Sequence, residues 1–321
     1  MTPAASGRQL TTIVVGEGGP DGRRALESIG RVTLVDARRA DLTVLEAVEA
    51  AFVWDFRSRS LESLLPELPN LRWIHTASAG VDHIVGPGVR DAGIAVSNSA
   101  GIFDRPIAEY VLGLVFIHAK SFARTIEAQR ERRWAYRATT DVSGRTMAVV
   151  GLGRIGRVVA ELAQAVGINV IGVRSSGAGV SNVEVVPADR LGEALGAADY
   201  VVVTAALTPA TRGLIGRSAI EAMKPSAYLI NVARGAIVDT DALVEALSRG
   251  RIAGAALDVF VDEPLPASSP LWTTPGLLIS PHMAGDTHGW DVRVAELFAA
   301  NVDRYLAGEP LINEVDQARG Y

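Results

Sequence analysis

The stretch Thr146-Met-Ala-Val-Val-Gly-Leu-Gly-Arg-Ile-Gly156 decides how this chain folds. Its apolar first half predicts a buried strand at 146–150, and residues 157–166 after it have helical spacing. In a dinucleotide site, Gly151 permits the tight turn, Gly153 lets the backbone approach a pyrophosphate, and Gly156 lets the helix pack closely on the strand. The N-terminus of the helix then offers N–H groups and a partial positive charge to the phosphates. The alternative, a glycine turn that binds nothing, is disfavoured because the motif lies between a strand and a helix.

The strand that follows the motif indicates which dinucleotide binds. An NAD site usually has Asp or Glu about 20 residues beyond the motif, where the acid binds the ribose hydroxyls. Here the predicted strand 169–173 is followed by Arg174, Ser175 and Ser176, and no carboxylate is present. Arg174 can pair with a 2′-phosphate and the serine hydroxyls can donate to it, so the sequence favours NADP over NAD. A solvent-exposed arginine with no role in cofactor binding is the alternative.

Apolar segments of strand length alternate with helical segments on both sides of the motif. Such alternation produces parallel sheets that helices cover on both faces, so we predict an α/β fold. Helices are expected at 23–29, 61–65, 105–119, 125–133 and 291–306. The remaining predicted strands span residues 11–15, 32–35, 51–54, 71–76, 94–96, 200–204, 228–232, 254–258 and 277–280.

Length, composition and charge narrow the class of protein. With 321 residues, the chain exceeds the size at which one hydrophobic core usually stops growing, so we expect two domains. The formal net charge of -5 disfavours nucleic acid and anionic membranes as partners. The chain has no cysteine, which excludes disulfides, thiolate catalysis and cysteine-type zinc sites, and no metal site is expected. Neither a secretory signal nor a membrane span is recognisable, so we expect a cytoplasmic protein.

Three further motifs follow or end predicted strands and contain the candidate catalytic residues. They are Ile230-Asn-Val-Ala-Arg-Gly235, Ala256-Leu-Asp-Val-Phe-Val-Asp-Glu-Pro264 and Ser280-Pro-His-Met-Ala-Gly285. In open parallel sheets, ligands bind outside the carboxyl ends of the strands. We therefore expect Arg234, Glu263 and His282 to converge at that edge.

These residue types suit the reduction of a ketone. Hydride addition builds negative charge on the carbonyl oxygen, and His282 is the natural general acid because imidazole titrates near neutral pH. Glu263 can bond the other ring nitrogen and orient the imidazole, while Arg234 can clamp a substrate carboxylate and polarise the ketone. Taken singly, each has a structural alternative: a surface ion pair, a turn residue before Pro264, and a loop histidine. Their order behind a dinucleotide motif favours the catalytic interpretation.

Further segments complete a pattern typical of one family. They are Ala77-Ser-Ala-Gly-Val-Asp82, Asn98-Ser-Ala-Gly101, Ile107-Ala-Glu-Tyr110, Leu207-Thr-Pro-Ala-Thr-Arg212 and Met223-Lys-Pro225. With the motifs above, they resemble the D-isomer-specific 2-hydroxyacid dehydrogenases, most closely the branch with glyoxylate and hydroxypyruvate reductases. The resemblance implies hydride transfer between NAD(P)H and a small 2-keto acid to give a D-2-hydroxy acid. Formate is disfavoured, because formate dehydrogenases of this superfamily carry Gln where Glu263 stands.

The resemblance also implies roles at matching positions. Arg234, Glu263 and His282 match the catalytic residues of the family. The backbone of Ser78, Ala79 and Gly80 matches the loop that binds the substrate carboxylate together with Arg234. Within the cofactor set, Arg154 and Ile155 match donors to the pyrophosphate, Asp258 matches the residue at the nicotinamide carboxamide, and Thr204 stands on the adenosine side where the family often has His. The full set expected at the cofactor is Gly151, Gly153, Arg154, Ile155, Gly156, Arg174, Ser175, Thr204 and Asp258.

The implied architecture is a pair of Rossmann-like, doubly wound parallel-sheet domains with a cleft between them. A flavodoxin-like substrate domain would comprise residues 1–100 and 286–321, and a dinucleotide-binding domain residues 101–285. We expect a homodimer because the predicted helix 105–119 is too apolar to face solvent. The segment 134–142 would then form an arm over the partner. Burial of that helix within one chain is the alternative.

A second class of function is a dinucleotide-sensing binding or co-repressor-type protein without turnover, as in some relatives of this fold. Retention of Arg234, Glu263 and His282 argues against it, as does the lack of a basic patch. Oxidation of NADPH in the presence of small keto acids distinguishes the two classes. The sequence does not specify which keto acid is preferred.

Overall fold

The chain folds into two compact units in the computed structural model, which describes residues 7–37, 41–55, 60–175 and 182–318. The first unit comprises Met1–Phe103 and Thr287–Tyr321, and the second comprises Asp104–Asp286. The two ends of the sequence therefore share one unit. The assignment of one unit to the substrate and the other to the dinucleotide stays a prediction at this point.

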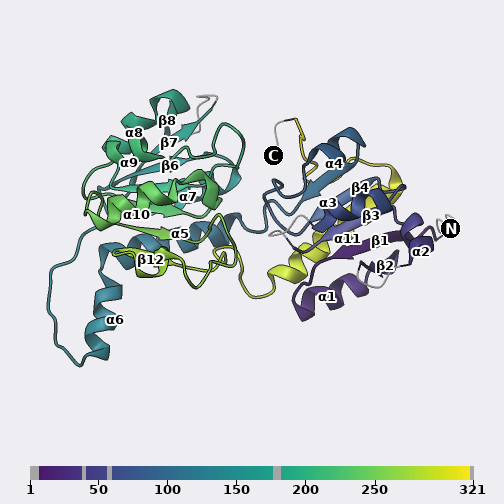
Figure 1. Ribbon diagram of the computed structural model, residues 1–321, viewed down its shortest axis with the longest axis horizontal. Coiled ribbons are helices and arrows are strands. Elements are labelled where there is room, and N and C mark those ends of the chain that lie inside the picture. The colour runs from purple at the N-terminus through teal and green to yellow at the C-terminus, as the bar shows by residue number, and fades with distance from the viewer. Residues whose placement is uncertain (1–6, 38–40, 56–59, 176–181, 319–321) are drawn as a thin grey trace. The chain divides into compact units, whose positions relative to one another are not determined.

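The first unit is built on a parallel sheet of five strands in the order β2-β1-β3-β4-β5. This is the flavodoxin-like order of doubly wound sheets. The strands are β1 (Leu10–Val15), β2 (Val32–Asp36), β3 (Ala50–Val53), β4 (Trp73–Thr76) and β5 (Ala95–Asn98). The helices are α1 (Pro20–Glu27), α2 (Leu42–Glu46), α3 (Ser60–Leu64), α4 (Pro87–Asp91) and α11 (Trp290–Ala307) (Figure 1).

Successive residues of these strands point to opposite faces of the sheet, and each face has its own core. One face packs with α2, α3 and α4 in an aliphatic cluster that includes Ile13 and Ile74. On the other, Phe298 of α11 lies against Phe52 and Trp73, with ring centroids 4.9 and 5.1 Å apart. The C-terminal helix thus completes the core of a unit that begins at the other end of the chain.

The second unit is built on a parallel sheet of seven strands in the order β12-β11-β10-β9-β6-β7-β8. Renumbered within the unit, this is the Rossmann order 3-2-1-4-5-6 with one strand added. The strands are β6 (Thr146–Val150), β7 (Asn169–Arg174), β8 (Glu184–Pro187), β9 (Tyr200–Val203), β10 (Tyr228–Asn231), β11 (Gly254–Leu257) and β12 (Leu277–Ile279). The helices are α5 (Asp104–Ala119), α6 (Phe122–Arg130), α7 (Arg154–Ala165), α8 (Leu191–Ala197), α9 (Arg217–Ala222) and α10 (Thr240–Ser248).

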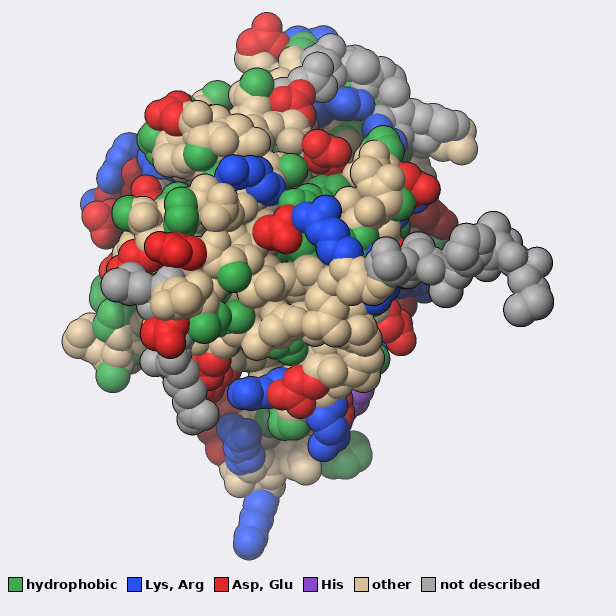
Figure 2. All heavy atoms as spheres, turned by 90° about the vertical axis from the view of Figure 1, so that its right-hand side faces the viewer, with side chains coloured by type: hydrophobic (Ala, Val, Ile, Leu, Met, Phe, Trp, Pro, Cys, Tyr) green, Lys and Arg blue, Asp and Glu red, His purple; other side chains and the backbone are tan. Residues whose placement is uncertain are grey.

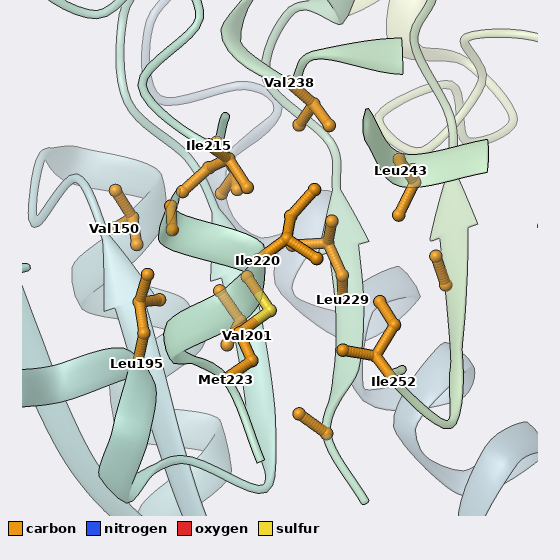
Figure 3. Packing of buried hydrophobic residues seen from close by; sticks show 14 of the residues in the cluster. Val150, Leu195, Val201, Ile215, Ile220, Met223, Leu229, Val238, Leu243 and Ile252 are labelled. Carbon is orange, nitrogen blue, oxygen red and sulfur yellow. The ribbon is translucent and has the colours of Figure 1, made fainter. Parts of the chain in front are cut away.

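Alternating strand residues also divide the core of the second unit. Val150, Val201 and Leu229 join the side chains of α8, α9 and α10 in one cluster, which Figure 3 shows at close range. Met147 and Val149, from the same strand as Val150, join α5 and α7 on the opposite face. Because both faces are covered, the strands read as continuous apolar runs rather than as alternating ones.

The predicted helices differ from the observed ones at their ends, and helices α2, α4, α8, α9 and α10 were not predicted. The predicted helix 125–133 is α6, which begins at Phe122 and ends at Arg130. The left-handed backbone of Arg132, with φ 55°, ends it there. Strand β8 was not predicted, since its sequence, Glu-Val-Val-Pro, combines a charge and a proline at the edge of the sheet.

The surface carries charges of both signs. Acidic and basic side chains lie interspersed over the face shown in Figure 2, in keeping with the small net charge of -5. In the described part of the chain, no helix has both the length and the apolar character needed to cross a membrane.

Candidate active site

The carboxyl edge of the seven-stranded sheet gathers the candidate residues of the second unit. Strand register aligns Val150 of β6 with Val203 of β9 and with Asn231 of β10. It aligns Asn231 in turn with Leu257 of β11 and Ile279 of β12. The glycine turn and the loops of the three catalytic candidates therefore leave the sheet at the same edge.

The glycine turn has the geometry that a dinucleotide requires. Gly151 has φ +105°, and a Cβ there would lie 2.5 Å from the Ala205 backbone. A Cβ on Gly156 would lie 2.1 Å from the Gly151 carbonyl oxygen, so the helix approaches the turn as closely as only glycine permits. A Cβ on Gly153, in contrast, would meet nothing within 4 Å, and Gly153 caps α7 without a side chain. The open space beside Gly153 and the side-chain-free start of α7 fit a pyrophosphate.

Thr204 makes two hydrogen bonds to the backbone at the glycine turn. Its N–H donates to the Val150 carbonyl (2.9 Å), and its Oγ1 donates to the Gly151 carbonyl (2.7 Å). The sequence placed Thr204 on the adenosine side of the cofactor but did not reveal this bond. Its signal in the sequence is only its position after β9, which lies beside β6 in the sheet.

Arg174 and Ser175, which the sequence places at the 2′-phosphate of NADP, lie beside the glycine turn. The Gly151 N–H donates to the carbonyl of Val173 (2.9 Å), and Arg174 and Ser175 follow Val173 directly. Arg174 is half-buried and Ser175 is exposed. Ser176, the third residue of that prediction, lies outside the described residues.

A hydrogen bond joins Glu263 and His282. Nδ1 of His282 lies 2.7 Å from Oε2 of Glu263, while Oε1 of Glu263 accepts from the Phe260 N–H (2.8 Å). Burial raises the pKa of Glu263, but the hydrogen bonds from His282 and Phe260 and the charges of His282 and Arg234 outweigh it, so the net pKa is lowered. A carboxylate that faces Nδ1 favours the ring form with a proton on that nitrogen.

Asp258 fixes the loop that carries the histidine. Its carboxylate accepts from Ser280 Oγ (2.6 Å), Met283 N–H (3.0 Å) and Ala284 N–H (2.9 Å). Its carbonyl accepts from the His282 N–H (2.7 Å), and His282 has a left-handed backbone with φ 54°. The sequence assigned Asp258 to the nicotinamide carboxamide and missed this anchoring of the loop. The carboxamide role stays a prediction.

Arg234 follows β10 in a turn that Asn231 closes. The side-chain amide of Asn231 donates to the Arg234 carbonyl (3.0 Å) and accepts from the Ala233 N–H (3.1 Å). A Cβ on Gly235, the next residue, would lie 2.1 Å from the Phe260 backbone, so glycine lets this turn approach the loop that leads to Glu263. The charge of Arg234 helps to lower the pKa of Glu263.

Ser78, Ala79 and Gly80 lie in the first unit, on the loop after β4. Ser78 Oγ donates to the Gly80 carbonyl (2.6 Å), and the Asn98 side chain donates to the Ala79 carbonyl (2.8 Å). The Ser99 N–H donates to the Ser78 carbonyl (3.0 Å). The loop is thus held by its carbonyl groups, and two of the three donors, Asn98 and Ser99, lie at the end of β5 and directly after it.

The chain is similar in sequence and structure to known proteins of one family. Residues 112–284 match the family model described as "D-isomer specific 2-hydroxyacid dehydrogenase, NAD binding domain". The glyoxylate reductase of Thermofilum pendens is 36% identical over 255 residues, which cover 75% of this chain and 74% of that protein. A D-isomer specific 2-hydroxyacid dehydrogenase of Xanthobacter autotrophicus, solved with NADPH and MES, is 32% identical with a TM-score of 0.83, over 98% of this chain and 100% of the other. An NADPH-dependent glyoxylate/hydroxypyruvate reductase of Sinorhizobium meliloti, solved with NADP and sulfate, is 26% identical with a TM-score of 0.85 over the same shares.

Proposed function

The chain belongs to the D-isomer specific 2-hydroxyacid dehydrogenases, and we propose that it reduces glyoxylate, hydroxypyruvate or a similar small 2-keto acid with NADPH. As a member of this family it is an oxidoreductase that transfers a hydride between a nicotinamide dinucleotide and a 2-keto or 2-hydroxy acid. The single observation that carries the proposed mechanism is the 2.7 Å contact between His282 Nδ1 and Glu263 Oε2.

In this mechanism each candidate residue has a defined role. Gly151, Gly153 and the start of α7 would hold the dinucleotide, which would supply the hydride that adds to the carbonyl carbon. His282 gives a proton from Nε2 to the carbonyl oxygen as negative charge develops there. Glu263 accepts from Nδ1 and keeps the imidazole in one orientation. Arg234 binds the carboxylate of the substrate and polarises the ketone, and the N–H groups of the Ser78–Gly80 loop bind that carboxylate as well.

Turnover with a panel of small keto acids tests this proposal. We expect NADPH oxidation by the wild-type protein with at least one two- or three-carbon 2-keto acid. His282→Ala should lower kcat by about 10²- to 10⁴-fold, while the Kd for NADPH measured by fluorescence stays at the wild-type value. Glu263→Gln keeps the shape of the side chain and should lower kcat as well, because the charge that orients and stabilises the imidazolium is lost.

The same experiment separates the alternatives. Binding of NADPH without oxidation by any keto acid would favour the co-repressor-type alternative. Turnover of His282→Ala at the wild-type rate would remove histidine from the mechanism.

The preference for NADP is a finer part of the proposal. Arg174 is the last residue of β7, the strand beside the glycine turn, and no acidic residue occurs from 170 to 183, where an NAD site usually has one. The relatives solved with NADPH or NADP support the same choice. Arg174→Asp should shift the ratio of kcat/KM for NADPH over NADH toward NADH, and an unchanged ratio would refute the role of Arg174.

We also propose that two copies of the chain associate through α6 and the segment after it, which extend away from the seven-stranded sheet (Figure 1). Exposed apolar side chains gather there, since Phe122 is 48%, Ile126 51%, Trp134 97% and Tyr136 93% exposed. Helix α5, on which the sequence argument for a dimer rested, packs against α7 within its own unit. The case for a dimer therefore shifts to α6 and the segment 134–142.

Light scattering after gel filtration tests the dimer. We expect twice the chain mass of 33.8 kDa for the wild type and the chain mass itself for the double variant Ile126→Glu with Trp134→Ser. Val44→Ser is the matched control, because Val44 is also an exposed apolar residue (38%) but lies in the first unit. A wild type that elutes at the chain mass overturns this proposal.

A further inference from the structure

In the loop after β4, hydrogen bonds fix the carbonyl groups of Ser78 and Ala79. The Ser99 N–H donates to the Ser78 carbonyl (3.0 Å), and Asn98 Nδ2 donates to the Ala79 carbonyl (2.8 Å). In a trans peptide group, the carbonyl and the following N–H point in opposite directions. The first bond therefore directs the Ala79 N–H away from Ser99, and the second directs the Gly80 N–H away from Asn98. Within the described part of the chain, neither N–H donates to another residue.

Asn98 is itself locked in one orientation. Its Oδ1 accepts from the Ala100 N–H (3.1 Å), so the amide cannot turn over without losing this bond and the bond to Ala79. Asn98 is only 8% exposed, so water cannot readily replace either partner. From the other side, Asn313 Nδ2 donates to the carbonyls of Ala100 (2.7 Å) and Asn98 (3.3 Å). The two asparagines form a clasp, Asn98–Asn313, behind the loop.

The C-terminal segment places Asn313 in this clasp. Its carbonyl accepts from the Asn98 N–H (3.2 Å), and Val315 N–H donates to Val96 of β5 (2.8 Å). Asn301 of α11 holds the residue before Asn313 through both groups of its amide, to Ile312 N–H (2.7 Å) and Ile312 carbonyl (3.1 Å). Asn313 has φ 56°, a left-handed conformation that asparagine tolerates better than most residues. The segment is thus fixed on both sides of Asn313.

We propose that Asn98 and Asn313 are positioning residues for the substrate: their amides aim the N–H groups of Ala79 and Gly80 at the substrate carboxylate. Donors that are already aligned bind an anion without the cost of reorganising when it arrives. The proposal rests on the proposed function, in which this loop binds the carboxylate of a 2-keto acid. It adds that Asn313, in the C-terminal segment, strengthens the binding of that acid.

Two variants and one control test the clasp. Asn98→Ala removes the donor to Ala79, and Asn313→Gly removes the donor to Asn98 and Ala100 while keeping a residue that suits the left-handed backbone. Both should raise KM for the keto acid about tenfold and leave kcat nearly unchanged, because carboxylate binding is equally strong in the ground and transition states. Gln317→Ala is the matched control, since its amide also binds the C-terminal segment to the first unit, through the carbonyl of Ile94 (2.7 Å), which precedes β5 at the end away from Asn98.

Binding of oxamate to the enzyme–NADPH complex gives a readout that does not depend on turnover. We expect its Kd to rise about tenfold in Asn98→Ala and Asn313→Gly, with NADPH affinity close to that of the wild type. The two hydrogen bonds lost in Asn313→Gly should lower its melting temperature by a few degrees. A wild type that reduces keto acids, together with variants that keep the wild-type KM and oxamate Kd, overturns the clasp alone. An equal rise of KM in Gln317→Ala also overturns it, because the effect would then be a general loosening of the segment. A wild type that neither turns over keto acids nor binds oxamate overturns the proposed function and the clasp together.

Discussion

Gly153 and Gly156 share one turn but meet different surroundings, so alanine at each position separates cofactor binding from folding. A Cβ on Gly153 would meet nothing within 4 Å. A Cβ on Gly156 would lie 2.1 Å from the Gly151 carbonyl oxygen and 2.9 Å from Thr204 Oγ1. Gly153→Ala should therefore weaken binding of NADPH without unfolding the protein, and Gly156→Ala should destabilise it.

The magnitudes follow from these distances. Carbon–oxygen contacts normally begin at about 3.3 Å, so Gly156→Ala must displace a backbone carbonyl by roughly 1 Å. Overpacking of this kind costs about 1–3 kcal/mol, which should lower the melting temperature by several degrees. For Gly153→Ala, a less favourable N-cap and a less flexible unfolded chain offset each other, so the free energy of unfolding should change by less than about 1 kcal/mol. Its methyl group would occupy the space of the pyrophosphate, so the Kd for NADPH should rise at least about tenfold, which is about 1.4 kcal/mol.

Thermal unfolding by circular dichroism and NADPH titration by fluorescence measure the two effects separately. Gly192→Ala is the matched control, because Gly192 lies exposed in α8 and a Cβ there would also meet nothing within 4 Å. It should stabilise the helix by about 0.5–1 kcal/mol and leave the Kd for NADPH unchanged. Wild-type affinity for NADPH in Gly153→Ala would refute the assignment of the pyrophosphate to this turn. An unchanged melting temperature in Gly156→Ala would refute the close packing.

Two further predictions concern stability. Burial lowers the pKa of His75 to about 3. Because the imidazole has a pKa of about 6.5 in the unfolded state, the unfolded state binds the proton first as the pH falls. The free energy of unfolding should therefore decrease from about pH 6.5 toward pH 3, by up to about 1.4 kcal/mol per pH unit. His75→Gln removes this group, so the fall of the free energy of unfolding with pH, measured by urea unfolding between about pH 6.5 and 4, should be shallower by up to the same amount. An identical slope would show that the folded and unfolded states do not differ in the protonation of His75. Thr204→Val removes the hydroxyl that donates to the Gly151 carbonyl (2.7 Å), which should lower the free energy of unfolding by about 0.5–1.5 kcal/mol and raise the Kd for NADPH a few-fold. Unchanged values of both in Thr204→Val would mean that the bond does not support the turn.

The local features of this chain could be predicted from the sequence because they depend on neighbours along the chain. The strand at Thr146–Val150, the glycine turn and the helix after it follow from an apolar run, three glycines and helical spacing within about two dozen residues. The edge of the sheet at which Arg234, Glu263 and His282 gather was also predictable, since each follows a strand and parallel strands end at one edge of their sheet. Edge strand β8 was missed because its polar ends lack the apolar pattern of a central strand.

The bonds that hold the site in place could not be predicted, because they join residues far apart in the sequence. Asp258 meets Ser280 and Ala284 only because β11 and β12 pair in one register. Asn313 meets Asn98 only because α11 returns the end of the chain to β5. Composition and periodicity describe which face of an element is buried, whereas the register of strands and the path of the chain decide which polar groups meet. The sequence alone thus determined the residue types of the candidate site and the edge of the sheet where they gather, and the tertiary structure decided which residues hold them in place.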